Sequence, residues 1–407
     1  MIRIAKHIPR LSALARASTR PFSSLPSLHS LTEEEVLLRD AVRKFANEQI
    51  RPKVREMDEA ELLDKSVLKA LFDQGLMGIE AESKYGGSES SFMSAILTIE
   101  ELAKVDPSVS VVCDVQNTLV GTLFNKYATE AQKEKYLTRL NTDTVGCFCL
   151  SEAGSGSDAF ALQTRAEKHG DYYTISGSKM WITNSYEADI FLVFANVDPS
   201  KGYKGITCFI VEREDGVKIA KKEIKLGIRA SSTCGLSFDD IKVPADRVLG
   251  EIGKGYKYAI EILNEGRIGI AAQMIGLAQG AMDEALPYMF QRKQFGTFIG
   301  DFQGMQFQYA QIATEIEAAR LLTYNAARLK EEGKDVVQQA AMAKLYSSQV
   351  AERASSKAVE WVGGVGFTRE FPIEKFYRDS RIGAIYEGTS NIQLATIAKY
   401  VKAHYAK

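Results

Sequence analysis

A block of strand-like segments without helical sequence between them interrupts a chain that otherwise reads as helical. Short runs of branched and aromatic residues follow one another between residues 146 and 255, at 147–150, 172–175, 180–183, 190–194 and 206–211. Turn-forming residues separate these runs, including 169–171 and 176–178. Strands joined in this way form an antiparallel sheet or a barrel, because a βαβ sheet needs helices between its strands.

Helical spacing of apolar residues is found on both sides of this block. From Thr32 it indicates helices around 91–104, 114–125 and 130–139, and after Gly255 three long helices at 256–289, 303–331 and 336–362. Long helices joined by short loops form a bundle. We therefore predict an α+β multidomain protein with an N-terminal helical domain (31–145), a middle antiparallel, barrel-like β-domain (146–255) and a C-terminal helical bundle (256–407).

The first thirty residues differ in composition from the rest of the chain. They are rich in Ser and Arg, carry five basic residues and contain no Asp or Glu. This composition is typical of a mitochondrial transit peptide, which we predict over 1–25, with a processing site near Arg20–Ser23. A disordered tail is the alternative. The five cysteines form no C-x-x-C pair, which fits reduced thiols in the mitochondrial matrix.

Charge and hydropathy exclude several classes of function. The chain has 51 basic and 52 acidic residues, and the basic leader leaves the remainder mildly acidic, which argues against nucleic-acid binding. No apolar run approaches the roughly 20 residues that a membrane span needs. Scattered cysteines and only four histidines predict no metal site.

Glu387 is the best-placed candidate for a general base. His7 and His29 lie in the leader, His169 lies in a polar turn and His404 lies at the end of the chain, so a catalytic histidine is disfavoured. Glu387 precedes a glycine, and Thr389 or Ser390 can cap the helix that follows. A helix N-terminus favours phosphate, so base and anion site would be adjacent. The alternative is an ordinary solvated carboxylate.

Other motifs carry weaker signals. Residues 151–159 contain G-x-G-x-x-A, but strand-like sequence follows, which excludes a Rossmann unit and leaves a phosphate- or ring-binding loop or a surface turn. Trp181 is either core packing or the wall of a flat cofactor site. The glycines after Glu360 read as a helix C-cap. Arg292 is either a solvated helix-end cation or a phosphate ligand.

Six motifs in this order resemble the acyl-CoA dehydrogenase family, over essentially all of the chain from Thr32. They are Phe148–Ser157, Trp181–Thr183, Lys225–Arg229, Arg292–Gly296, Gly363–Gly364 and Tyr386–Asn391. The similarity is greatest to the short/branched-chain (2-methylacyl-CoA) members. It implies FAD as cofactor, a C-terminal four-helix bundle, and α,β-dehydrogenation of short or 2-methyl-branched acyl-CoA to trans-2-enoyl-CoA. It also implies electron transfer to electron-transfer flavoprotein and a role in fatty-acid or branched-chain amino-acid catabolism.

The resemblance also implies individual residue roles, with Glu387 as the base. For FAD it implies Phe148, Leu150, Ser151, Gly156, Ser157, Trp181, Ile182, Thr183, Thr389, Ser390 and Asn391, with Arg292, Gln303, Glu360, Trp361, Val362, Gly363 and Gly364 from a neighbouring subunit. For acyl-CoA it implies Ser157, Tyr203, Tyr256, Asn264, Glu265, Gly266, Arg267 and Gly388. The backbone N–H of Glu387 would stabilise the thioester oxygen, and a buried apolar site would raise the pKa of the carboxyl group.

Two departures from the family pattern bear on function. Gly266 stands where the isovaleryl and long-chain branches carry the base, which disfavours those branches, and Glu360 replaces a common Gln. The alternatives to a short/branched-chain enzyme are a straight short-chain (butanoyl-CoA) dehydrogenase and a non-catalytic acyl-CoA-binding or assembly scaffold; an oxidase is a further rival. We expect a homo-oligomer, a tetramer built as a dimer of dimers.

Overall fold

The computed structural model describes residues 30–406, so the predicted transit peptide and the histidines at positions 7 and 29 lie outside the described part. The N-terminal region is helical and carries three π-helical segments that interrupt otherwise regular helices, at Ala46–Ile50, Val115–Gly121 and Lys133–Leu137. Its α-helices are α1 (Glu33–Phe45), α2 (Val54–Ala60), α3 (Lys65–Asp73), α4 (Phe92–Ala103), α5 (Pro107–Asp114), α6 (Thr122–Tyr127), α7 (Glu130–Gln132) and α8 (Thr138–Thr142).

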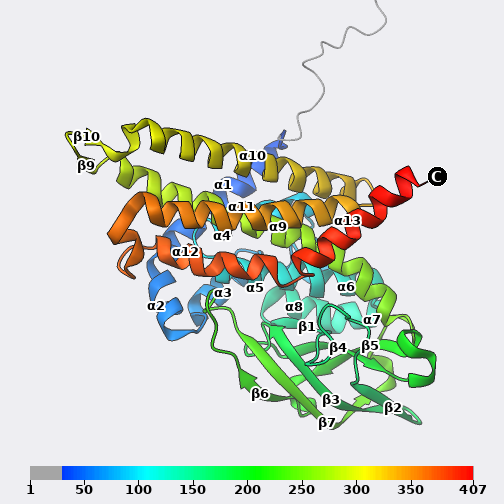
Figure 1. Cartoon of the computed structure of the whole chain (residues 1–407). Helices are drawn as coiled ribbons and strands as arrows, with labels where there is room; N and C mark the ends of the chain where they lie inside the picture. The colour runs from blue at the N-terminus through cyan, green and yellow to red at the C-terminus, as the bar shows by residue number, and fades with distance from the viewer. Residues whose placement is uncertain (1–29, 407) are drawn as a thin grey trace, which may run out of the picture.

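The middle region forms one eight-stranded sheet. Its strands are β1 (Gly146–Cys149), β2 (Arg165–His169), β3 (Tyr172–Thr183), β4 (Ile190–Asn196), β5 (Ile206–Glu212), β6 (Lys218–Lys222), β7 (Thr233–Pro244) and β8 (Val248–Leu249). The pairing order is β6-β7-β3-β2-β4-β5-β8, with β1 beside β4. Figure 1 shows this sheet below the long helices.

The expectation of a purely antiparallel sheet is wrong for two pairs. β1 runs parallel to β4 over four residue pairs, and β2 is parallel to β4 where Arg165 faces Asn196. The chain returns from β1 to β4 through a long loop and the β2–β3 hairpin, and this path serves as the crossover that a parallel pair requires.

The predicted turn at 176–178 is also wrong, whereas the turn at 169–171 is present. β3 continues through 176–178 as one twelve-residue strand, with a register shift at Gly177, whose φ is +146°. A glycine inside a strand marks a bulge as readily as a turn, and the sequence does not distinguish them.

β4 is buried on both faces, which places the sheet between two hydrophobic cores. Leu192 and Phe194 face the core that includes α9, whereas Phe191 and Val193 face the core shared with the N-terminal helices. This alternation follows the two-residue period of a strand. The β-domain is therefore packed against helices from both ends of the chain.

The C-terminal region is a helical bundle built on three long helices, close to the lengths that the sequence predicts. They are α9 (Gly255–Met289), α10 (Gln303–Glu331) and α11 (Val337–Val362), followed by α12 (Ile373–Ser380) and α13 (Ser390–Tyr405). A short hairpin, β9 (Lys293–Gln294) and β10 (Thr297–Phe298), joins α9 to α10 at one tip of the bundle (Figure 1).

Buried charges join the three regions. Asp58 of the N-terminal region accepts hydrogen bonds from Arg378 of α12 at 2.8 and 3.1 Å. Arg378 also contacts the backbone of residue 226, and the backbone N–H of Ile228 donates to Asp379. A Cβ on Gly227 would lie 2.3 Å from the carbonyl oxygen of residue 378, so only glycine permits this approach.

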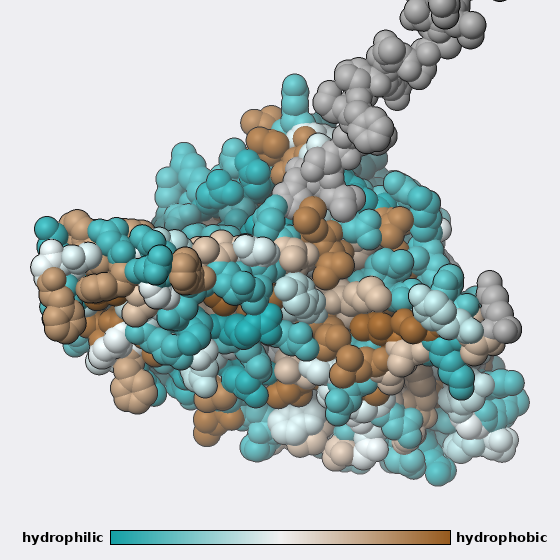
Figure 2. Space-filling model, turned by 45° about the horizontal axis from the view of Figure 1, so that its top comes forward, coloured by the Kyte–Doolittle hydropathy of each residue, from teal (hydrophilic) through white to brown (hydrophobic). Residues whose placement is uncertain are grey.

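Within residues 30–406 no helix combines the length and the apolar character needed to cross a bilayer. In Figure 2 hydrophobic residues appear in separate patches on a largely hydrophilic face, including the protruding end that carries the β9–β10 hairpin. Phe295, between the two strands of that hairpin, is 96% exposed.

Candidate active site

Glu387 lies on a strained turn that leads into α13. Its φ is +50° and that of Gly388 is +86°, so two consecutive residues adopt left-handed conformations. The cost for a non-glycine residue is about 1 kcal/mol or more, and such strain persists only where surrounding contacts over-determine it. Thr389 caps α13 by accepting from the N–H of Ile392 at 3.4 Å, as the sequence predicts.

Two buried donors hold the carbonyl groups of this turn. Gln393 Nε2 donates to the carbonyl oxygens of Glu387 and Gly388 at 3.0 and 2.9 Å. Lys344 of α11 donates from Nζ to the Gly388 carbonyl at 2.7 Å. Both side chains are fully buried, so the turn is anchored to the bundle interior.

The Glu387 carboxylate points at a glycine of α9. A Cβ on Gly266 would lie 2.9 Å from Glu387 Oε2 and 2.9 Å from the Leu119 side chain. Any side chain at position 266 would therefore displace the carboxylate or the leucine. Glu265, its neighbour, points elsewhere and pairs with Lys126 at 2.6 Å and Lys330 at 3.3 Å.

The carboxylate of Glu387 has an unusual electrostatic setting. The residue as a whole is half-buried, yet its Oε2 is buried and has no hydrogen-bond partner among the described residues. Burial raises the pKa of Glu387 to about 7, although the charges of Arg267 and Lys344 oppose this shift. A carboxyl group with this pKa exchanges its proton near neutral pH, as a general base must.

A second carboxyl group, Asp114 at the end of α5, lies nearby and was missed by the sequence reasoning. It occupies the space above Gly269, where a Cβ would lie 2.0 Å from its Oδ1. Gly269 is one helical turn beyond Gly266, so both carboxyl groups lie along one stripe of α9. The pKa of Asp114 is raised well above its usual range, mainly by burial and to a smaller extent by the negative charge of Glu387. An aspartate before a π-helical turn has no distinctive sequence signal.

The glycine-rich loop lies against β3. Lys179 is buried and donates to the Leu150 carbonyl at 3.0 Å and to Glu152 at 2.8 Å, and the N–H of residue 180 donates to the Ser151 carbonyl. Ser157 is exposed, and a Cβ on Gly154 or Gly156 would meet nothing within 4 Å. The loop therefore presents open backbone beside the strand that carries residues 181–183.

Trp181 does not pack in the core. It sits at a bulge with φ of +64° and is 54% exposed, while Ile182 next to it is buried. Phe148 is partly buried against Phe194 at 4.9 Å between ring centroids. An exposed indole beside an open glycine loop fits the isoalloxazine and phosphate groups of FAD, since both an aromatic face and free backbone are available.

Aromatic side chains gather at the start of α9. The rings of Tyr203 and Tyr256 are 4.8 Å apart, and Phe160 lies edge-on to Tyr256 at 6.4 Å. Further along α9, Asn264 accepts a hydrogen bond from Arg267 at 3.0 Å. The substrate candidates on α9 thus run from these aromatic rings to the stripe beneath Glu387.

The structure does not bring the remaining cofactor candidates to this place. Arg292 follows the far end of α9, and the 23 residues from Gly266 to Met289 span about 35 Å of helix. Gln303, Glu360, Gly363 and Gly364 are exposed, and Gly363 forms the predicted C-cap with φ of +70°. The indole of Trp361 is buried and donates to Gln308 at 3.2 Å, and Val362 is also buried.

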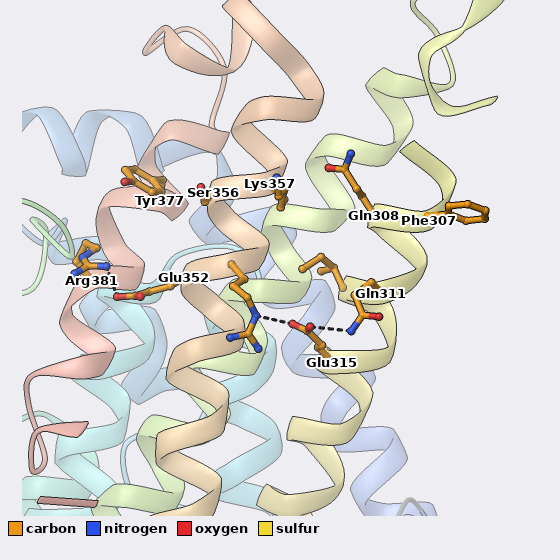
Figure 3. A pocket seen from close by; sticks show the side chains of 11 residues that line it. Phe307, Gln308, Gln311, Glu315, Glu352, Ser356, Lys357, Tyr377 and Arg381 are labelled. Carbon is orange, nitrogen blue, oxygen red and sulfur yellow. Dashed lines mark hydrogen bonds and ion pairs between the residues drawn. The ribbon is translucent and has the colours of Figure 1, made fainter. Parts of the chain in front are cut away.

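A separate groove of about 550 Å³ lies between α10, α11 and α12 (Figure 3). Exposed Phe307 and half-exposed Tyr377 line it, and Glu315 accepts from Gln311 at 2.9 Å and from Arg353 at 2.8 Å. It contains none of the predicted site residues.

Three family models match successive parts of the chain. They describe the acyl-CoA dehydrogenase N-terminal domain at residues 32–144, the middle domain at 147–241 and the C-terminal domain at 253–402.

Individual proteins are similar over almost the full length. The short/branched chain specific acyl-CoA dehydrogenase, mitochondrial, of Rattus norvegicus is 60% identical over 93% of this chain and 88% of its own. The butyryl-CoA dehydrogenase structure from Megasphaera elsdenii is 42% identical, with a TM-score of 0.89 over 91% of this chain and 99% of that one. A chain in the electron transferring flavoprotein structure from Acidaminococcus fermentans is 41% identical, with a TM-score of 0.90 over 92% and 99%.

Proposed function

Because the chain belongs to the acyl-CoA dehydrogenase family, a family of FAD-dependent oxidoreductases, we propose that it converts short or 2-methyl-branched acyl-CoA to the trans-2-enoyl-CoA. The observation that carries this proposal is Glu387, a carboxylate with a buried, unpartnered oxygen and a pKa of about 7, on a turn anchored by two buried side chains.

Glu387 is the group that takes the α-proton of the thioester. Its free carboxylate oxygen accepts the proton, and its position over Gly266 leaves no side chain of α9 between it and the substrate. Its backbone N–H donates to the thioester oxygen as negative charge develops there. A donor of this kind contributes roughly 3–4 kcal/mol to transition-state stabilisation.

The residues that would hold FAD are the loop 150–157, Trp181–Thr183 and the N-terminus of α13 at Thr389–Asn391. Bound there, FAD would supply the acceptor for the hydride that leaves the β-carbon. The chain contributes an exposed indole face, open loop backbone and the N–H groups of a sixteen-residue helix, which suit a phosphorylated aromatic ligand.

The acyl-CoA enters along α9, past the aromatic rings of Tyr203 and Tyr256. Ser157, Asn264 and Arg267 contact it on the way to the carboxylate. Glu265 does not share this role, because its side chain is committed to two lysines on another face of the helix. Gly266 supports the 2-methylacyl branch over the isovaleryl and long-chain branches.

The similar proteins support a proposal for the partners and the compartment. We propose electron-transfer flavoprotein as the electron acceptor, which the similarity to a chain in an electron transferring flavoprotein structure supports. We also propose the mitochondrial matrix as the location; a relative at 60% identity that is named mitochondrial supports the organelle. We also assign a homo-oligomer, a dimer of dimers. Arg292, Gln303 and Glu360–Gly364 are remote from Glu387 in one chain and would serve the FAD of a neighbouring copy. The exposed Phe307 and Tyr377 at the groove of Figure 3 offer contacts for such packing.

The test of the catalytic assignment is Glu387→Gln. This variant should remain yellow and loaded with FAD, because the amide keeps the shape of the side chain, yet turnover should fall by orders of magnitude because no base remains. Near-normal turnover in the FAD-loaded variant would refute the assignment. A colourless wild-type protein that takes up no FAD would refute the function as a whole and leave the scaffold alternative.

Acyl specificity requires a separate experiment. Wild-type protein is mixed anaerobically with butanoyl-, 2-methylbutanoyl-, isobutanoyl-, isovaleryl- and hexanoyl-CoA, and the bleaching of the flavin band is followed. We expect the fastest bleaching with 2-methylbutanoyl-CoA. A clear preference for butanoyl-CoA would favour the straight short-chain alternative, and one for isovaleryl-CoA would overturn the branch assignment. Hydrogen peroxide formed during turnover would indicate an oxidase.

A further inference from the structure

Lys344 is a buried cation whose direct contact is a backbone carbonyl. Its side chain is fully buried on α11. The buried lysines Lys179 and Lys375 each contact a carboxylate at 2.8 Å or less. Within residues 30–406 Lys344 makes no such ion pair; its Nζ donates to the carbonyl of Gly388 at 2.7 Å. Burying an ammonium group is costly, so its retention here needs a reason.

The carbonyl that Lys344 holds belongs to the turn of the base. Glu387 and Gly388 adopt consecutive left-handed conformations, and a strained backbone relaxes unless its polar groups are held. Gln393, within α13, donates hydrogen bonds to the carbonyls of Glu387 and Gly388. Lys344 donates to the Gly388 carbonyl from α11 and so connects this turn to that helix. Without it the Gly388 carbonyl loses its link to the long helices of the bundle.

The charge of Lys344 also acts on the carboxylate. The negative charge of Glu387 stabilises the ammonium form of Lys344, and the positive charge of Lys344 stabilises the carboxylate form of Glu387. Arg267, from α9, contributes a second positive charge to the same carboxylate. Two cations from two different helices therefore face the one group that removes the proton.

We propose that Lys344 is a positioning residue for the dehydrogenation: its ammonium group fixes the turn that carries Glu387 and keeps a positive charge beside the carboxylate. The proposal rests on Glu387 being the base. It adds a residue on α11, 43 positions earlier in the chain, to the machinery of proton removal.

The sign of the pH effect follows from the groups around Glu387. These are Arg267 on α9, Lys344 on α11, Asp114 at the end of α5 and Tyr386 beside it in the turn. Burial raises the pKa of Glu387 to about 7 and lowers that of Lys344 to about 8, so both groups are charged between these values. Removing the cation favours the protonated carboxyl group and raises the pKa of Glu387 further.

The experiment compares kcat/KM against pH for FAD-loaded wild-type protein and four variants. Lys344→Met removes charge and donor, Lys344→Gln removes the charge and keeps an N–H donor, and Lys344→Arg keeps both. The matched control is Ser348→Ala, one turn further along α11. Ser348 is also buried and donates to a backbone carbonyl of another segment, that of Gly383, at 2.8 Å, but it carries no charge.

We expect the acid limb of kcat/KM to move up by about one pH unit or more in the Met and Gln variants, the range that a neighbouring opposite charge exerts. A one-unit move lowers kcat/KM about five-fold at pH 7 and restores it at pH 9. The Gln variant should keep a higher plateau than the Met variant, because it retains the donor. The Arg variant and Ser348→Ala should keep the wild-type limb.

An unchanged acid limb in either neutral variant overturns the proposal, as does an equal shift in Ser348→Ala. If neither neutral variant retains FAD, Lys344 is required for folding and the positioning role is wrong. These outcomes can be told apart from failure of the proposed function. If the Glu387→Gln variant is active, Glu387 is not the base and the proposed mechanism fails. If that variant is inactive but the acid limb of the Lys344 variants is unshifted, only the role of Lys344 is refuted.

Discussion

The raised pKa of Glu387 has a consequence for stability that can be measured without substrate. An unfolded chain exposes this carboxyl group to water, where its pKa is near 4.5, whereas in the folded protein it is about 7. The folded state therefore binds the proton more tightly. This contribution to stability is complete below pH 4.5 and is lost as the pH rises through 7, since ionising the group in the folded protein then costs free energy.

The magnitude follows from the shift in pKa. One pKa unit corresponds to about 1.4 kcal/mol, so the ionised carboxylate costs about 3 kcal/mol of folding free energy at pH values above 7. Glu387→Gln mimics the protonated group and carries no charge. We expect this variant to be more stable than wild type by about 3 kcal/mol at pH 8.5, with the difference falling to about 1 kcal/mol near pH 5 and vanishing below pH 4.5.

The assay is thermal unfolding of the FAD-loaded wild type and variant, followed by circular dichroism across this pH range. For a chain of this length, 1 kcal/mol corresponds to about 1 °C in Tm if unfolding is cooperative, so the difference should open to about 3 °C at pH 8.5. Glu265→Gln is a useful comparison. The Glu265 carboxylate is paired with two lysines, so neutralising it should lower the stability of the folded protein. A Tm difference for Glu387→Gln that is absent at pH 8.5, or constant across the range, would contradict the reasoning.

Two further predictions concern stability, one from a close contact beside the site and one from a buried ion-pair cluster. Gly269→Ala should destabilise the protein by about 1–3 kcal/mol, because the new methyl group meets Asp114 Oδ1 at 2.0 Å. The double variant with Asp114→Ala should recover most of this loss of stability, measured by urea unfolding. Additive losses in the double variant would show that the clash is relieved elsewhere. Lys375→Met should cost about 3–5 kcal/mol, because it leaves Asp106 and Asp379 buried without their cation. Replacing both aspartates by asparagine in that variant should restore much of the stability, and a triple variant as unstable as the single one would argue against this explanation.

Much of the site was predictable because its signals are local. Glu387, Gly388 and Thr389 are adjacent in the chain, and a carboxylate, a glycine and a helix cap have recognisable patterns. The long helices at 255–289, 303–331 and 337–362 were predictable because apolar periodicity over many turns leaves little ambiguity. The family resemblance rested on motifs of the same local kind.

Other features were decided by contacts between distant segments. Asp114 and Gly269 are 155 positions apart and carry no signal of their meeting, and Lys344 reads as an ordinary helix residue until α11 is packed against the turn of Glu387. Trp181 was ambiguous because strand sequence does not tell which face a bulge will expose. The parallel pairing of β1 with β4 could not be predicted for a similar reason, since the periodicity of strand residues does not determine the order of strands in a sheet.

The sequence alone determined the succession of helical and β regions, the candidate base and the cofactor class, because each depends on residues near one another in the chain. Only the tertiary structure decided the charge environment of that base. Burial and the convergence of α5, α9 and α11 set its pKa, and both are properties of packing, which no local pattern contains.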